Sequence, residues 1–130
     1  VLCAFDASFC AGLLEAVTQV AVDRRSLLLV AYDTEYPQPI HAKRPVPDAF
    51  GAAMVLTPDR ESNSMVQIEM ALGGDLPDCM PDAVLESLRL SIPAARCLPL
   101  LQCIARGSSG RAVLEYLGGS SLAVVVEPCV

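Results

Sequence analysis

The apolar run from Leu27 to Tyr32 constrains the fold of this 130-residue chain more than any other feature. Ser26 and Asp33 bound this run, which is typical of a strand buried on both faces. Such strands occur in sheets whose two faces are covered by helices. The sequence therefore predicts an α/β fold in which residues 27–32 form a strand deep in a sheet.

An amphipathic helix is predicted just before this strand, over residues 7–22, where apolar residues recur at helical spacing. Asp6 or Ser8 is expected to cap it, because short oxygen-bearing side chains accept bonds from the first free amides of a helix. Residues 1–5 are short and apolar and are interpreted as the end of a strand. Strand, helix and strand in this order favour a right-handed crossover between two parallel strands.

The rest of the chain is predicted to complete the same single domain, with residues 1–72 as its αβ core. Strands are expected at 49–57 and 65–72, joined as a hairpin through 58–64. Residues 73–130 add helical segments around 84–88 and 98–105, a helical turn at 112–117 and a last strand at 122–127. The proline-rich stretch 33–48 is predicted to be a long loop, of the kind that often carries function or an interface.

Charge and composition exclude several classes of function. Fifteen acidic against nine basic residues give a net charge of -6, which repels a phosphate backbone, so we expect no nucleic-acid partner. No apolar run approaches the ~20 residues of a membrane span, so we expect a soluble, cytoplasmic protein. We interpret Val1 as the start of a processed product or fragment, since no leader pattern is evident.

The six cysteines are expected to be reduced and mostly buried thiols. No CxxC pair exists, and Cys97 and Cys103 are spaced wrongly for a structural zinc site. We therefore predict neither a metal nor a cofactor.

Few residues suggest chemistry without analogy. His41, the single histidine, has no nucleophile near it in sequence and is interpreted as a solvated loop residue. The junction from Cys3 to Cys10 is a better candidate. A helix N-terminus after a buried strand is where α/β enzymes lower the pKa of a thiol and stabilise an oxyanion.

This junction carries a resemblance to a known family. The run Asp6-Ala7-Ser8-Phe9-Cys10-Ala11-Gly12-Leu13-Leu14-Glu15-Ala16 resembles the helix after the active-site turn of β-ketoacyl synthases. Residues 27–32 and 48–56 are similar to the strand and the apolar segment that follow. Together they resemble the β-ketoacyl synthase-like N-terminal domain family of fatty acid, polyketide and aryl-polyene clusters. The resemblance implies part of a thiolase-like fold, with a mixed sheet and flanking helices.

Departures from the family shape the expected activity. An ungapped alignment places Asp6 where the family has its nucleophile, and a carboxylate cannot hold an acyl group as usefully as a thiolate does. Cys3 is the alternative nucleophile if three residues are inserted before Ala7. The family also uses two histidines in its active site, whereas this chain has one. The resemblance therefore implies a non-catalytic subunit, similar to a chain-length factor.

Partners follow from the same resemblance. The family pairs the strand before the nucleophile helix across a dimer, so residues 1–5 are the expected interface with a ketosynthase-like subunit or a second copy. His41, Lys43 and Arg44 could contact an acidic acyl carrier protein, or form a solvated loop. Two other hypotheses remain: an active 3-oxoacyl synthase component that uses Cys3, and a small α/β structural or binding domain.

Overall fold

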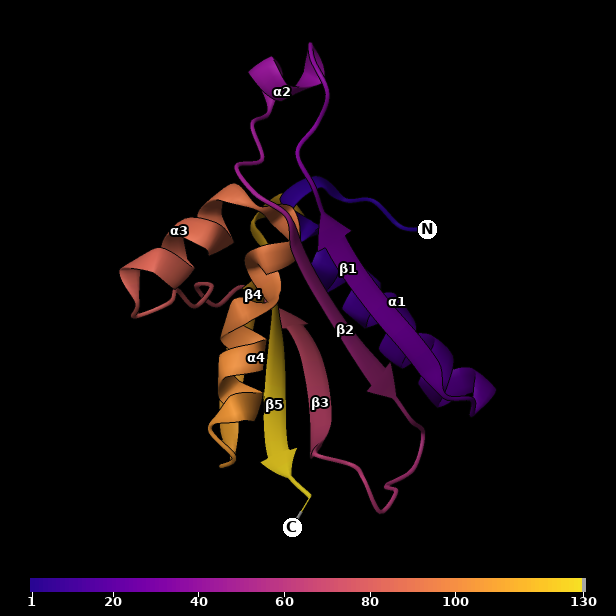
Figure 1. The fold of residues 1–130 in the computed structure, drawn as a ribbon. Coiled ribbons are helices and arrows are strands. Elements are labelled where there is room, and N and C mark those ends of the chain that lie inside the picture. Colours follow the sequence, from indigo (N-terminus) through magenta and orange to yellow (C-terminus); the bar gives the residue numbers. More distant parts are fainter. Residues whose placement is uncertain (130) are drawn as a thin grey trace.

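The computed structural model describes residues 1–129, which form a mixed α/β fold with helices beside two small antiparallel sheets (Figure 1). This confirms the predicted α/β class and its flanking helices. The strands are β1 (Leu27–Asp33), β2 (Phe50–Leu56), β3 (Val66–Gly73), β4 (Gly110–Glu115) and β5 (Ser121–Pro128). The helices are α1 (Ser8–Asp23), α2 (Ile40–Lys43), α3 (Ala83–Ser91) and α4 (Leu98–Ala105), with 3-10 turns η1 (Phe5–Ala7), η2 (Pro93–Cys97) and η3 (Leu117–Gly119).

The strand pairing differs from the prediction. β1 pairs with β2 in register from Leu27 opposite Leu56 to Asp33 opposite Phe50. The second sheet has the order β3-β5-β4, and every described pair is antiparallel. The predicted hairpin between 49–57 and 65–72 is therefore wrong, because β2 and β3 take different partners. The predicted parallel pair is also wrong, because residues 1–4 form no strand and residues 5–7 form η1.

Most of the predicted helices are confirmed. The periodic segment 7–22 is α1, the segment around 84–88 is α3, and 98–105 is α4 with Pro99 in its first turn. The exception is 112–117, predicted as helical, which lies mostly in strand β4. Pairing with β5 on one edge overrides its local pattern, and the loop residue Asp78 bonds to both the N–H and the C=O of Val113.

One apolar core joins residues from both parts of the chain. Phe9, Cys10 and Leu13 of α1 lie in it together with Leu100 and Leu122. The inward side chains of β1, β2 and β3 pack against the same cluster without being fully buried. Residues 1–72 and 73–129 therefore share a core rather than forming separate units.

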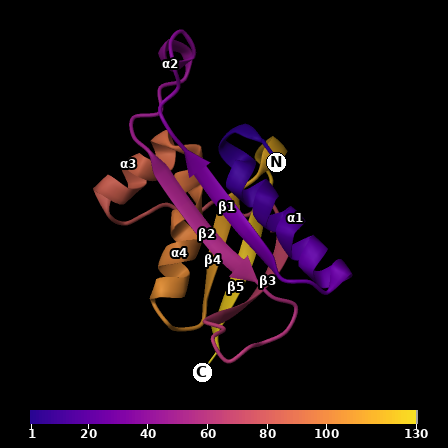
Figure 2. The same ribbon diagram turned by 45° about the vertical axis from the view of Figure 1, so that its right-hand side comes forward.

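The connection between β1 and β2 is the long proline-rich segment, and it contains the single-turn helix α2. Figures 1 and 2 show α2 projecting beyond the rest of the molecule. At its base Val46 is fully buried against Ile92 and Ala95 in a second, smaller cluster. The loop is thus anchored near the start of η2, and this brings it beside the N-terminal turn.

The close approach of β4 and α4 gives a first prediction. A Cβ added at Gly110 would lie 2.7 Å from the Sγ of Cys103. Gly110→Ala should therefore lower the free energy of unfolding by about 1–3 kcal/mol, as overpacking does. Urea denaturation measures this, and Gly74→Ala, where a Cβ meets no atom within 4 Å, is the matched control with a change below ~0.5 kcal/mol.

Removing the obstructing sulfur tests the cause. In the double variant Gly110→Ala with Cys103→Ala, the loss should be smaller than the sum of the two single losses. Strict additivity of the two losses would contradict the steric explanation.

The start of α3 gives a second prediction. Arg89 donates two hydrogen bonds to Glu86, and the N–H of Met80 donates a third. Chiefly because of the Arg89 bond, the pKa of Glu86 falls from 4.5 to about 2. A lowered folded-state pKa contributes stability that is present above pH ~4.5 and is lost as the pH falls towards 2.

Urea midpoints measured between pH 6 and pH 2 should therefore fall less steeply in Glu86→Gln than in the unmodified chain. Glu61→Gln, at an exposed loop position, is the control and should leave the slope unchanged. Equal slopes for Glu86→Gln and the unmodified chain would overturn this assignment.

Candidate functional site

A strained turn leads into α1. Phe5 has a φ of 51°, in the left-handed region that non-glycine residues rarely adopt. The Ser8 hydroxyl fixes the turn: it accepts a 2.9 Å hydrogen bond from the N–H of Ala4 and donates a 2.6 Å bond to the carbonyl of Phe5. Strained backbone of this kind gathers at functional sites, and here it sits at the predicted active-site junction.

Asp6 does not cap α1, and that prediction is wrong. The cap position is Ala7, and no side chain bonds to the free amides there. Asp6 instead accepts a hydrogen bond from the Nη2 of Arg44, and an Nη of Arg96 lies 3.9 Å from its other oxygen. Two guanidinium groups compete more strongly for this carboxylate than a backbone amide does.

Arg96 extends these contacts into a four-residue network. It donates a 2.6 Å hydrogen bond to Glu115 on β4, and its side chain is 13% exposed. The network links η1, the β1–β2 connection, η2 and β4. Asp6 thus ties η1 to the β1–β2 connection and to η2, and Arg96 extends the tie to β4.

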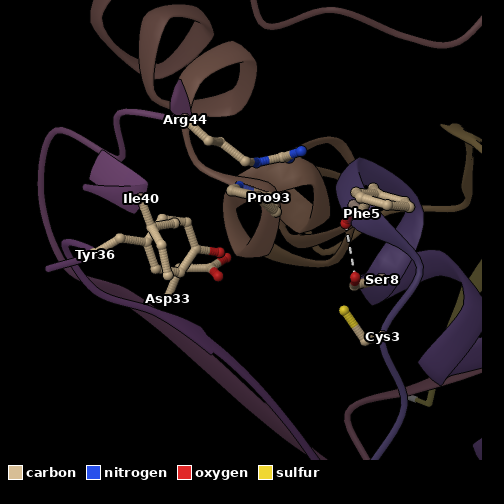
Figure 3. Close-up of a pocket in the computed structure, with 8 residues that line it drawn as sticks. All are labelled: Cys3, Phe5, Ser8, Asp33, Tyr36, Ile40, Arg44 and Pro93. Atoms are coloured by element: carbon tan, nitrogen blue, oxygen red, sulfur yellow. Dashed lines mark hydrogen bonds between the residues drawn. The ribbon is translucent and has the colours of Figure 1, made fainter. Parts of the chain in front are cut away.

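A cavity of about 240 Å³ adjoins this turn (Figure 3). Cys3, Phe5 and Ser8 lie on one side of it, and Asp33, Tyr36 and Ile40 lie on the other. Arg44 and Pro93 complete the lining. The cavity therefore lies at the predicted junction, between the N-terminal turn and the proline-rich connection.

Three polar side chains of the cavity lining, those of Ser8, Asp33 and Arg44, make hydrogen bonds within the chain. The Asp33 carboxylate accepts a 2.6 Å hydrogen bond from the N–H of Ala94, and the Ser8 hydroxyl makes both of its bonds within the turn. The lining includes no histidine; His41 lies on α2. Nucleophilic catalysis needs a base within hydrogen-bond reach of the nucleophile. The one carboxylate in the described lining, Asp33, lies across the cavity from Cys3 and Ser8 (Figure 3).

The cysteines differ sharply in their surroundings. All six are free; Cys10, Cys97 and Cys103 are buried, whereas Cys3 and Cys79 are exposed. Burial raises the pKa of both Cys10 and Cys97 to about 12, so these thiols stay protonated near neutral pH. Cys3 is the one cysteine in the cavity lining, and of the two predicted nucleophile positions, Cys3 and Asp6, it alone lines the cavity.

The basic trio of the long connection is divided by the fold. Arg44 turns inward to Asp6, and its guanidinium lies 5.9 Å from the ring centroid of Phe5. Lys43 stays exposed on α2, and His41 is half-buried beside it. The sequence analysis singled out Arg44 as a surface charge and missed Arg96. No motif or charge pattern around Arg96 indicates that it contacts Asp6.

Two further features bear on the site's chemistry. Among residues 1–129 no group of three or more His, Cys, Asp or Glu side chains could hold a metal ion. Residues Phe5–Asp23 are long and apolar enough to cross a membrane by length and composition. α1 contributes Phe9, Cys10 and Leu13 to the core, and both core helices and N-terminal signal sequences meet the same criterion.

No family model, curated protein or solved structure matches this chain.

The surroundings of the thiols give a third prediction. Exposed Cys3 and Cys79 should react with iodoacetamide before the other cysteines, with Cys10 and Cys97 last, because burial blocks access and keeps those two protonated. Peptide mass spectrometry over a time course at pH 8 measures the order. Early labelling of Cys10 or Cys97 in the folded chain would contradict the described packing.

Proposed function

We propose that this chain is a β-ketoacyl synthase-like subunit of fatty acid or polyketide biosynthesis that performs no condensation itself, similar to a chain-length factor. In this proposal it belongs to the thiolase-like superfamily and works in the cytoplasm beside a catalytic ketosynthase. The partner supplies the cysteine and histidines that act on acyl carrier protein thioesters.

The state of Asp6 is the observation that carries this proposal. The family resemblance puts Asp6 at the nucleophile position, and there its carboxylate is bound by Arg44 and Arg96. A carboxylate held in this way ties segments together and does not accept an acyl group from a thioester. In this proposal the turn at Phe5 keeps a structural role and carries no acyl transfer.

The arrangement of the first half of the chain gives further support. The segments that resemble the family, 6–16, 27–32 and 48–56, correspond to α1, β1 and β2 in the same order. α1 packs against β1 and lies in the apolar core, as expected of a helix that presents an active-site turn at its N-terminus. A strained residue, Phe5, stands at that turn.

A second candidate function is an active synthase component that uses Cys3. Its specific support is that Cys3 is exposed and lines the cavity beside Ser8. In this candidate function the histidines come from another chain, because the described lining holds none.

Intact mass spectrometry separates the two functions. The chain is mixed with a catalytic ketosynthase and an acyl-loaded carrier protein, and each subunit is weighed. The non-catalytic proposal expects the acyl mass on the ketosynthase and none on this chain. An acyl adduct that disappears in Cys3→Ser but persists in Cys79→Ser, the matched exposed control, would overturn it and support the second candidate.

A further inference from the structure

The outer face of the β1–β2 hairpin carries no charged side chain, and its one polar atom in a side chain is the Tyr32 hydroxyl. Leu28, Val30, Tyr32 and Val55 are each between 53% and 74% exposed. The register sets Leu28 opposite Val55, Val30 opposite Ala53, and Tyr32 opposite Gly51. We call these six residues the open face; they form one continuous apolar surface over both strands.

The second sheet provides an internal comparison. Its exposed positions include Gln67 and Glu69 on β3 and Arg111 and Glu115 on β4, so it is largely polar outside and apolar inside. That alternation is what an antiparallel sheet facing water requires. The β1–β2 hairpin lacks this alternation of polar and apolar side chains. Its open face is therefore as apolar as a sheet face that is covered by another element. Contiguous apolar surface of this kind marks interaction sites.

The free edge of β1 points the same way. β1 pairs with β2 alone, and no backbone hydrogen bond joins residues 27–33 to any other segment of residues 1–129. Natural edge strands are guarded by lysines, prolines or bulges against pairing with other chains. β1 has none of these and is apolar from Leu27 to Tyr32. It lies at an edge but has the sequence of a strand in the middle of a sheet.

We propose that the open face and the free edge of β1 together form a docking surface for a strand–helix unit of a partner α/β chain. The partner's strand pairs with the free edge of β1, and its helix covers the open face. A strand alone would bond to the free backbone groups of β1 but leave the open face in water. A helix alone would cover the open face but leave those backbone groups unpaired. A strand followed by a packed helix satisfies both, as in covered α/β sheets.

Area argues against a second copy of this chain as the occupant. Full burial of a Leu or Val side chain removes about 100 Å² from water, and of a Tyr about 200 Å². At the observed exposures the open face offers on the order of 300 Å². Two such faces in contact bury about 600 Å², well below the ~1,200 Å² of a specific interface, and leave both edges unpaired. Edge-to-edge pairing of β1 with the β1 of a second copy leaves both open faces in water.

This inference rests on the proposed function only for the identity of the partner, the catalytic ketosynthase. It also moves the interface from residues 1–5, where the sequence placed it, to β1 and β2. Residues 1–4 form no strand and offer no register for pairing.

Photo-cross-linking tests the surface. A benzophenone amino acid replaces Val30 in the full chain expressed in its source cells, and in a matched variant it replaces Val125, an exposed apolar position on β5. The expected result is a cross-link from position 30 to a helix next to a strand of one partner chain, with at least tenfold less from position 125. A cross-link to a second copy of this chain, or no cross-link, would overturn the proposal.

The partner's identity separates the two proposals. A strand–helix unit of a protein other than a ketosynthase would refute the proposed function and leave the docking surface standing. A ketosynthase captured through other residues, with position 30 unreacted, would refute the docking surface alone.

Substitution gives an independent readout. Val30→Glu should weaken binding of the cross-linked partner at least tenfold, because the carboxylate would be buried without a counter-charge. Val125→Glu should leave the affinity within twofold. Circular dichroism establishes that both variants are folded. Equal affinities for the two variants would contradict the proposal.

Discussion

The burial of one side of α1 is the constraint on which the rest of the structure depends. Phe9, Cys10 and Leu13 lie in a core to which the second sheet and α4 contribute fully buried residues and the β1–β2 hairpin contributes partly buried ones. This helix therefore holds together two sheets that share no hydrogen-bonded strand pair. It also fixes the position of the strained turn at its N-terminus, where Phe5 and Asp6 lie. The packing of α1 in the core therefore sets where the candidate site lies.

At that turn Asp6 forms an electrostatic tie to distant parts of the chain. Arg44 and Arg96 reach Asp6 from segments far away in the sequence, and Arg96 continues to Glu115. Arg96 is nearly buried, so its pairing with two carboxylates limits the cost of desolvating its charge. The network thus holds η1, the β1–β2 connection, η2 and β4 together through paired charges.

Periodicity in the sequence predicted the local elements well and their pairing poorly. The helix at 7–22 and the strands at 27–32, 49–57, 65–72 and 122–127 are present, since each carries its own apolar pattern. Which strands pair with each other depends on contacts between residues that are distant in sequence. The pairs β1–β2 and β3–β5 could therefore not be predicted from the apolar pattern of each strand. Cys3, which the sequence singled out, lies in the cavity lining, and its role stays a prediction. The contacts of Asp6 with Arg44 and Arg96 depend on tertiary packing. The spacing of these residues in the sequence does not predict them.

Amide hydrogen exchange across β1 tests the central claim, that this chain is one part of a larger α/β assembly completed at that strand. In the free chain the amides of residues 27–33 on the unpaired edge should exchange rapidly, while those of β5, paired on both edges, stay protected. In the assembly isolated from its source, the β1 amides should slow at least tenfold with β5 unchanged. Rapid exchange of the same β1 amides in both states would contradict the claim.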